Sequence, residues 1–354
     1  GILLPMIISL VKYRTFDEKP AGQISVLLLQ PALDPYNEKY QKDSLTIQSE
    51  LLALAEKNAA HADFYIGPET SLPGFGSISE TGLEQSLLLN NVKSFLQRHP
   101  KSVFATGISS HRFFREGVPP PNARQLEPLL WVESYNSAAQ IIPGQKVDVY
   151  HKAKLVPAVE IFPYLQYLKP ILGNAMLNFG GTIASLGISS ERKVFSNAFN
   201  KGRLAPIICY ESIYGEFVNG YVEKGANFLA IMTNDSWWGV TEGHKQLLSY
   251  ARLRAIETRR EIARSANSGI SARIDARGEI RQDEETLYGD QTALYTKINL
   301  YEGQTFYVRA GDLLSRICIF ALGFLLFYMI LNKFQNRKKE TPTAGKLPEI
   351  KKRL

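Results

Sequence analysis

Three polar residues stand where apolar runs of the chain end, and together they could catalyse acyl chemistry. Cys209 ends the run LAPIIC, Glu69 follows the run DFYIGP, and Lys152 ends VDVYHK. In open α/β sheets, ligands bind at the carboxyl ends of the strands, so such side chains can meet at one site. A thiol that attacks a carbonyl needs a base, and a nearby ammonium stabilises the negative intermediate. This pattern predicts a cysteine nucleophile with Glu69 as base and Lys152 as oxyanion partner.

Cys209 also lies at a predicted turn from strand to helix. Residues 204–209 predict a short buried strand, and residues 212–225 predict a helix. Enzymes of the α/β class expose nucleophiles at such turns, where the next backbone N–H groups can receive an oxyanion. The alternative is a small buried hydrophobic residue, because free cysteine is commonly buried. The second cysteine, Cys318, lies in an apolar span, so a disulfide is not expected and Cys209 stays free.

The elements that must position these residues alternate between strand and helix. At 45% hydrophobic content, the 354 residues can bury a substantial core. In the first part, this pattern predicts strands at 23–31, 62–66 and 102–108 and helices at 44–61 and 84–97. This alternation predicts an α/β fold with helices packed on a sheet.

The middle of the chain predicts a hairpin followed by a long irregular segment. Residues 111–128 are polar and proline-rich and predict a loop or hairpin extension. Residues 135–142 and 147–152 flank a Pro-Gly turn and predict a hairpin. Residues 157–198 are rich in glycine, proline and aromatic residues, and a loop of this length is usually functional or disordered. We expect a lid or arm here, whose aromatic side chains contact lipid or pack under the loop.

The second half of the chain again alternates predicted strands and helices. Strands are predicted at 227–233, 270–275 and 292–298, with a long helix at 242–260. No internal repeat, low-complexity block or linker divides residues 23–300. We therefore expect one catalytic domain.

Both ends of the chain predict membrane contact. Residues 313–331 are apolar except for Arg316, and their length matches one bilayer crossing; a buried core helix is the alternative. The tail at 332–354 holds eight basic residues and two glutamates, so it carries most of the formal charge of +7 and leaves no basic stripe for nucleic acid. The positive-inside rule predicts a cytoplasmic tail and a catalytic domain on the opposite face. Residues 1–14 are too short to span and predict the end of a preceding transmembrane helix, a signal-peptide remnant or an interfacial segment.

The three motifs resemble the Glu-Lys-Cys signature of the nitrilase, or carbon–nitrogen hydrolase, superfamily. They are GPET with Glu69, YHKAKLVP with Lys152 and IICYES with Cys209, and the resemblance covers about residues 23–298. TNDSWWG and RAIETRREIARSANSG also match the pattern. The resemblance implies a four-layer α-β-β-α sandwich, here followed by one C-terminal transmembrane helix.

Further features resemble the branch of this superfamily that N-acylates lipoproteins in the bacterial inner membrane. These features are YNSA, YHKAKLVPAVE, CYE at 209–211 and YVRAGDLLSR before the last helix. The resemblance implies that Cys209 takes an acyl chain from a phospholipid as a thioester. The N-terminal amine of a lipoprotein's diacylglyceryl-cysteine then receives the chain, which is the last step of lipoprotein maturation. The membrane, a phospholipid donor and a diacylated lipoprotein acceptor are the implied partners, and the catalytic domain would face the periplasm.

The same resemblance assigns roles to single residues. Glu69 would be general base and acid in both half-reactions, and Lys152 would stabilise the oxyanion together with the backbone N–H of Tyr210. Glu160 would orient Lys152 or the incoming amine, although the chain has AVE where the family commonly has Gly-Glu after Phe. The remaining supporting positions are Asn136 and Glu211.

Two other functions fit the same residues. A membrane-tethered nitrilase-type amidohydrolase would turn over soluble amides without lipid. A catalytically silent domain could bind lipoproteins or scaffold a complex, but it would have no reason to retain Glu69, Lys152 and Cys209. The five histidines are scattered and no phosphate-binding glycine loop occurs, so we expect no metal or other cofactor. We further expect a monomer and a structural role for His151.

Overall fold

The computed structural model describes residues 3–34, 42–57, 61–74, 76–115, 117–157, 159–161 and 186–339. Its contacts divide the chain into two units, at residues 1–309 and 310–354. Most of the predicted lid or arm, residues 162–185, lies outside the described residues, and so does the end of the predicted tail, residues 340–354.

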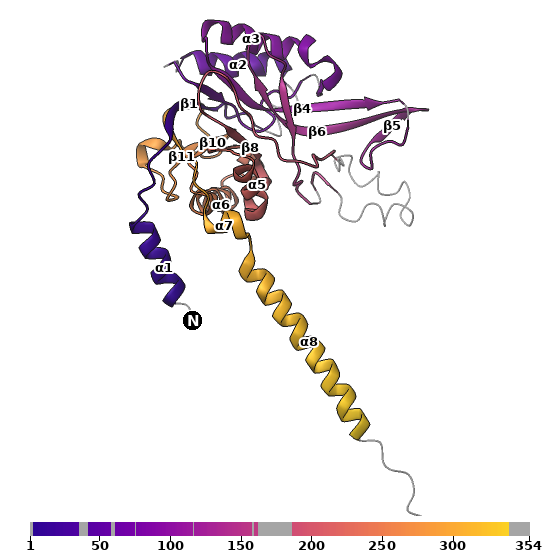
Figure 1. Ribbon diagram of the computed structural model, residues 1–354. Helices are drawn as coiled ribbons and strands as arrows, with labels where there is room; N and C mark the ends of the chain where they lie inside the picture. The colour runs from indigo at the N-terminus through magenta and orange to yellow at the C-terminus, as the bar shows by residue number, and fades with distance from the viewer. Residues whose placement is uncertain are drawn as a thin grey trace, which may run out of the picture. The chain divides into compact units, whose positions relative to one another are not determined.

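The first sheet combines a parallel centre with antiparallel edges (Figure 1). Its strands follow the order β12-β1-β2-β4-β6-β5, with β3 on β4 and β7 on β6. The strands β1, β2 and β4 pair in parallel, whereas β12 joins β1 and β6 joins β4 in antiparallel register. The bounds are β1 Gly22–Gln30, β2 Phe64–Ile66, β3 Ile78–Ser79, β4 Val103–Phe114, β5 Arg124–Glu127, β6 Leu130–Ile141, β7 Asp148–His151 and β12 Thr292–Leu300.

The second sheet has four strands in the order β11-β10-β9-β8. The strands β8, β9 and β10 run parallel, and β11 is antiparallel to β10. The bounds are β8 Leu204–Ile208, β9 Phe228–Thr233, β10 Ile262–Ala266 and β11 Ala272–Ile274. All residues of β8, β9 and β10 are buried, as expected of parallel strands covered on both faces.

Helices cover the outer face of each sheet and complete four layers (Figure 1). Helices α2 (Ser44–Lys57) and α3 (Leu87–Arg98) pack on the first sheet, and α5 (Gly215–Glu223) and α6 (Glu242–Thr258) lie beside the second. Alternate side chains of β1 belong to two different hydrophobic cores. Val26 and Leu28 pack in the core between the sheets, whereas Leu27 and Leu29 pack in the core under α2 and α3. The predicted α-β-β-α sandwich is therefore confirmed.

Several predicted boundaries shift in the structure. The helix predicted at 84–97 begins as a 3-10 turn, η1 (Glu80–Gln85), and becomes α-helical only after Ser86, whose extended backbone interrupts it. The helix predicted at 212–225 is likewise a 3-10 turn, η3 (Cys209–Ile213), followed by α5. Within the segment predicted at 111–128 as a loop or hairpin extension, β4 continues to Phe114 and β5 follows, and both strands pair with β6.

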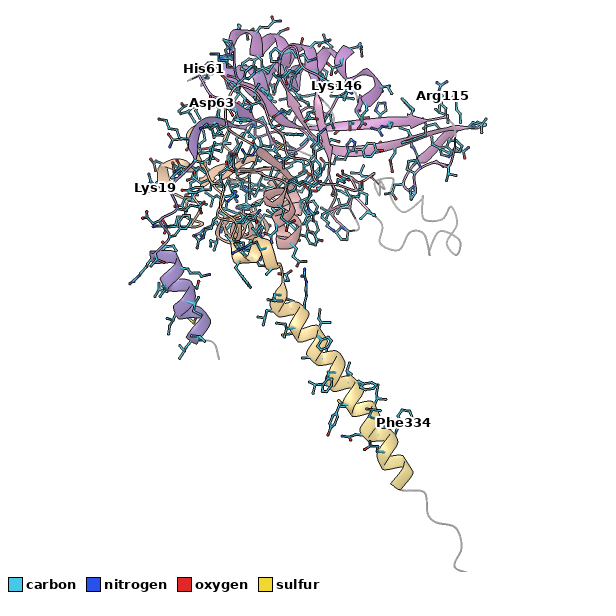
Figure 2. All side chains as sticks on the ribbon, in the orientation of Figure 1. Lys19, His61, Asp63, Arg115, Lys146 and Phe334 are labelled. Carbon is cyan, nitrogen blue, oxygen red and sulfur yellow. The ribbon has the colours of Figure 1, made fainter. Side chains whose placement is uncertain are left out.

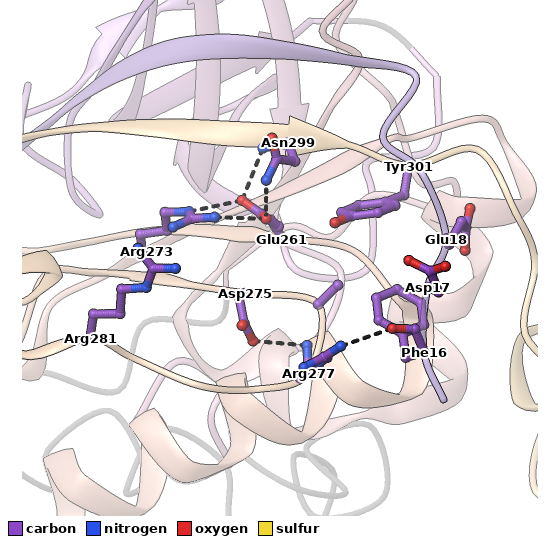
Figure 3. A pocket seen from close by; sticks show the side chains of 11 residues that line it. Phe16, Asp17, Glu18, Glu261, Arg273, Asp275, Arg277, Arg281, Asn299 and Tyr301 are labelled. Carbon is purple, nitrogen blue, oxygen red and sulfur yellow. Dashed lines mark hydrogen bonds and ion pairs between the residues drawn. The ribbon is translucent and has the colours of Figure 1, made fainter. Parts of the chain in front are cut away.

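The segment between α1 (Leu3–Arg14) and β1 is held by aromatic and arginine contacts. The guanidinium of Arg259 lies 4.5 Å from the centre of the Phe16 ring, and Arg277 donates to the carbonyl of Phe16 at 2.9 Å. Phe16 also packs near Tyr301, at 6.0 Å between ring centres. Figure 3 shows Phe16, Arg277 and Tyr301 in a mostly polar pocket, and none of the predicted catalytic residues lines it.

The second unit consists mainly of helix α8 (Leu313–Lys339), which follows the short helix α7 (Phe306–Ala310) at the boundary between the units. Its apolar side chains are exposed, among them Phe320 and Phe334 (Figure 2). Within the part of the chain that the structure describes, residues 313–335 are the one span long and apolar enough to cross a membrane. This length and composition are typical of a helix that crosses a bilayer.

Candidate active site

The three predicted catalytic residues follow the carboxyl ends of three strands. Glu69 comes shortly after β2, Lys152 directly after β7 and Cys209 directly after β8. The first two belong to the first sheet and the third to the second sheet. Lys152 and Glu69 are almost completely buried, at 1% and 7% exposure, so their charges interact in a medium that screens them weakly.

Four side chains of the first sheet and its loops form a closed ring of hydrogen bonds. Lys152 Nζ donates to Glu69 Oε1 at 3.0 Å and to Glu160 Oε1 at 2.9 Å. Asn136 Nδ2 donates to the same two oxygens, at 2.7 and 3.0 Å. Each carboxylate therefore accepts from both an ammonium and an amide. This arrangement brings together four of the predicted site residues, Glu69, Asn136, Lys152 and Glu160.

The second sheet contributes a donor that sequence reasoning missed. The backbone N–H of Asn234, which directly follows β9, donates to Glu69 Oε2 at 3.1 Å. It joins Asn136 and Lys152 as a donor to this carboxylate. Because the contribution is a main-chain group, side-chain chemistry gave no signal for it. Only the presence of TNDSWWG among the matching motifs pointed to this loop.

Cys209 stands on a strained turn. Its φ is +47°, in the left-handed region that non-glycine residues rarely adopt. The turn reverses the chain from β8 into η3, so the thiol lies where the strand ends while the following N–H groups belong to the 3-10 turn. Such outliers persist when the surrounding structure fixes them, and they cluster at functional sites.

Burial and a neighbouring carboxylate keep the thiol of Cys209 protonated at rest. Burial and the neighbouring Glu69 carboxylate raise the pKa of Cys209 to about 12, against the opposing effects of Lys152 and the Thr233 hydroxyl. Burial lowers the pKa of Lys152, but the carboxylates of Glu69 and Glu160 outweigh it and raise the pKa overall. The resting site thus holds a thiol, an ammonium and a base that can take the thiol proton as the sulfur attacks.

Glu211 clamps the two catalytic segments to each other. Its Oε2 accepts from the backbone N–H of Ile208 at 2.8 Å, and its Oε1 accepts from the backbone N–H of Ala153 at 2.7 Å. Tyr150 also donates to Oε1, at 2.6 Å. Burial raises the pKa of Glu211 to about 7, although these hydrogen bonds favour the carboxylate. The residue therefore ties the peptide before Cys209 to the peptide after Lys152.

The remaining predicted positions lie beside this centre. The Tyr210 ring packs edge-on against Tyr214, at 5.5 Å between centres, so its side chain is engaged within its own turn. Glu160 Oε2 accepts from the backbone N–H of Val156 at 2.8 Å, and the carbonyl of Glu160 accepts from Leu186 at 3.1 Å. The described ends of the predicted lid or arm are thus joined at Glu160.

Comparison with known proteins gives a family match over most of the chain. The model of the carbon–nitrogen hydrolase family matches residues 32–299. A relative in Chlorobaculum tepidum, named apolipoprotein N-acyltransferase, is 30% identical over 327 residues, which is 89% of this chain and 58% of the relative. A relative of the same name in Geobacter metallireducens is 27% identical over 90% of this chain and 56% of its own length. The chain therefore spans little more than half the length of these relatives.

Solved structures share the fold at low sequence identity. The Saccharomyces cerevisiae protein Nit3, described as a member of branch 10 of the nitrilase superfamily, superposes with a TM-score of 0.55 at 13% identity. The match covers 79% of this chain and 91% of Nit3. The CN-hydrolase superfamily protein XC1258 of Xanthomonas campestris superposes with a TM-score of 0.52 at 16% identity, over 78% of this chain and 91% of XC1258. These likenesses support the fold alone.

Proposed function

The chain belongs to the carbon–nitrogen hydrolase family, and from this membership we propose that it is the catalytic part of a lipoprotein N-acyltransferase. Two observations support the proposal together. Relatives named apolipoprotein N-acyltransferase match about nine tenths of the chain. The observation that carries the chemistry is the buried ring of Glu69, Lys152, Asn136 and Glu160 beside the free thiol of Cys209.

In the first half-reaction, Cys209 attacks the ester carbonyl of a phospholipid. Glu69 takes the thiol proton as the carbon–sulfur bond forms, because a thiol with a pKa near 12 is not ionised beforehand. The ammonium of Lys152 and the backbone N–H of Tyr210 stabilise the oxyanion. The carbon–oxygen bond of the ester then breaks, and Glu69 returns the proton to the leaving glycerol oxygen. The products are a thioester on Cys209 and a lysophospholipid.

In the second half-reaction, the N-terminal amine of a diacylated lipoprotein attacks the thioester. Glu69 takes one proton from the neutral amine, the carbon–sulfur bond breaks, and Glu69 returns the proton to the Cys209 sulfur. Among the described residues, Lys152 supplies an ammonium that pairs with both Glu69 and Glu160. The amine enters this step uncharged, because Glu69 takes up one proton and returns that same proton to the sulfur.

The membrane supplies both lipidated substrates in this proposal. The exposed apolar surface of α8 supports anchoring in a bilayer, and the basic residues after it support a cytoplasmic tail and a periplasmic catalytic domain. Protease added to sealed inner-membrane vesicles of known orientation tests this topology. We expect cleavage of the tail only from the cytoplasmic side, and cleavage from the periplasmic side would contradict the assignment.

A comparison of two acceptors, given separately, tests the proposed reaction. The protein is given phosphatidylethanolamine and either a synthetic diacylated lipopeptide with a free N-terminus or its N-acetylated form. We expect amide formation with the free amine alone, detected by mass spectrometry of the lipopeptide. Hydrolysis of soluble amides without lipid, together with no acylated lipopeptide, would favour a nitrilase-type amidohydrolase. Binding of lipopeptide without either reaction would favour a silent binding domain.

A further inference from the structure

A buried ion pair lies behind the loop that reaches Glu69. Arg264, on β10, and Asp235, at the start of the 3-10 turn η4 (Asp235–Trp238), meet at 2.7 Å between Nη2 and Oδ2. Their side chains are 1% and 0% exposed. Taking two charges out of water is so costly that a hydrophobic pair of similar volume is often at least as stable. Stability alone is therefore a weak reason for an ion pair at this position.

The Asp235 carboxylate is fixed from several sides. Its Oδ1 accepts from Thr233 Oγ1 at 2.8 Å, and its Oδ2 accepts from Arg264. Arg264 is itself held, because its Nη1 donates to the carbonyl of Ile270 at 2.5 Å. Gly269 gives the carboxylate its room, since a Cβ at that position would lie 2.1 Å from Oδ2. Contacts on both oxygens leave the carboxylate one orientation.

These contacts bracket the peptide unit that joins Thr233 and Asn234. Thr233 and Asp235, the residues on either side of Asn234, are joined by their side chains. The carbonyl of this peptide unit accepts from the backbone N–H of Asn267 at 3.1 Å, and the Asn234 side chain accepts from Asn267 Nδ2 at 3.1 Å. The N–H of the same peptide unit donates to Glu69 Oε2 at 3.1 Å. The second sheet thus holds the plane of a peptide that donates to the base.

The N–H of Asn234 adds a constraint that the two side-chain donors do not supply. Lys152 and Asn136 both donate to Oε1 of Glu69, whereas Asn234 donates to Oε2. Contacts at one oxygen fix its position but let the carboxylate rotate about it, and a contact at the other oxygen stops that rotation. The orientation of Glu69 toward the Cys209 thiol therefore depends on where the Asn234 N–H lies.

We propose that Arg264 and Asp235 are positioning residues for Glu69. The ion pair anchors Asp235 to β10, and the bond to Thr233 extends that anchor across Asn234. The Asn234 N–H then holds the Glu69 carboxylate in the orientation in which it takes the thiol proton. A hydrophobic pair could fill the same space but would not fix an orientation, because hydrogen bonds are directional. The contacts follow from the geometry alone, while their effect on acyl transfer rests on the proposed function.

Hydrogen exchange of the Asn234 amide tests the anchor. Asp235→Asn keeps the shape of the side chain but has one acceptor atom in place of two, so it loses its bond to Arg264 or to Thr233. We expect the Asn234 amide to exchange about tenfold faster in this variant, as for one lost hydrogen bond to a charged group. Mass spectrometry with fragmentation to single residues measures the rate.

The backbone amide of Leu229 is the internal reference for this exchange. It lies on the same strand, β9, and donates to the carbonyl of Glu261 at 3.0 Å. We expect its exchange to stay unchanged in Asp235→Asn. Equal exchange of the Asn234 amide in the variant and the wild type would overturn the proposal. Faster exchange of both amides would also count against it, because the whole strand would then be destabilised.

The link to Glu69 is tested by a double-mutant cycle on the reactivity of Cys209. Alkylation of the thiol by iodoacetamide requires the same proton to leave, and mass spectrometry localises the product to Cys209. The rate is measured in the wild type, in Asp235→Asn, in Glu69→Gln and in the protein with both changes. We expect the effect of Asp235→Asn to be about tenfold more adverse when Glu69 is present than in the Glu69→Gln background. A direct effect of Asp235 on the thiol would be equal in both backgrounds, so equal effects would refute the positioning role.

Glu261→Gln is the matched control for this cycle. Glu261 forms another buried ion pair of the second sheet, with Arg273 at 2.8 Å. We expect its effect on alkylation to be independent of Glu69, and the same dependence as in Asp235→Asn would also refute the role. Alkylation needs no lipid, so the cycle decides the positioning role separately from acyl transfer. Absence of acylation by phospholipid in the wild type would instead refute the proposed function.

Discussion

The two sheets hold their parts of the candidate site by different means. The first sheet supplies Glu69 and Lys152, which are fixed by a ring of side-chain hydrogen bonds. The second sheet supplies Cys209, which is fixed by a left-handed backbone turn. The acid–base half thus depends on charge pairing, whereas the nucleophile half depends on main-chain geometry.

Each sheet also sends one carboxylate to a main-chain group of the other half. Glu69 accepts from the N–H of Asn234 at the end of β9, and Glu211 accepts from the N–H of Ala153 after β7. These two reciprocal bonds cross between the sheets at the site. Small movements of reacting atoms cost large factors in rate, so the two crossing bonds set how well the halves are aligned.

The largest effect is expected from removing the ammonium of Lys152, which holds the acid–base half of the site together. Lys152→Met removes the only ammonium in the ring and leaves Glu69 and Glu160 facing each other. We expect acylation of Cys209 to slow by about 10³-fold, because the oxyanion also loses a donor. Lys154→Met, at a neighbouring exposed lysine, is the matched control. An undiminished acylation rate in Lys152→Met would refute the oxyanion assignment.

A smaller effect is expected from breaking a hydrogen bond that aligns the two halves of the site. At about pH 8, where the Glu211 carboxylate is mostly ionised, Glu211→Gln turns an amide N–H toward a backbone N–H and breaks one side of the clamp. We expect the acylation rate to fall by about 10²-fold while the protein stays folded. Glu223→Gln on the exposed side of α5 is the control. Equal rates for both variants would show that Glu211 does not align the site.

Removing the uncharged side chain of Asn136 from the ring should slow acylation less than removing the charged side chain of Lys152. Asn136→Ala removes one donor from each carboxylate but leaves both salt bridges of Lys152 in place. We expect a loss of about tenfold in the acylation rate, as for one neutral hydrogen bond. Asn90→Ala on the surface of α3 controls for the substitution. A loss as large as that of Lys152→Met would mean that geometry, and not charge, holds this half.

The smallest effect concerns stability and follows from the pKa of Glu211. Because burial raises this pKa to about 7 in the folded state, folding favours the protonated acid. Its contribution to stability is present below the ordinary glutamate pKa and is lost as pH rises through about 7. Relative to Glu211→Gln, the free energy of unfolding should fall by up to about 3 kcal/mol over this range. Parallel urea titrations of both proteins at several pH values measure the difference, and a constant difference would contradict the shift.

Sequence patterns predicted the strands that carry the site but missed one central strand. The strand β10, Ile262–Ala266, contains Arg264, whose charge hides the strand from a hydropathy pattern. The side chain is nevertheless buried because it pairs with Asp235, itself fully buried, at 2.7 Å. Local sequence does not reveal such a partner in the 3-10 turn that follows the neighbouring strand β9.

The same limit applies within the site. Glu69, Lys152 and Cys209 could be predicted, since each is a reactive side chain at the end of an apolar strand. The clamp of Glu211 could not, because it depends on how the two sheets pack. The contact of His151 with Glu80 was also missed, since Glu80 approaches it from another element. The chemistry of a side chain can be inferred from the sequence around it. Hydrogen bonds between elements that are distant in sequence can be identified only when the fold is known.

Intact-protein mass spectrometry tests the central claim most directly. The protein is incubated with phosphatidylethanolamine in detergent micelles, without an amine acceptor, and compared with Cys209→Ala. We expect a mass increase of one acyl chain that is labile to hydroxylamine, localises to Cys209 and is absent in Cys209→Ala. No adduct from any phospholipid, under conditions in which the protein is folded, would contradict acyl transfer through a Cys209 thioester.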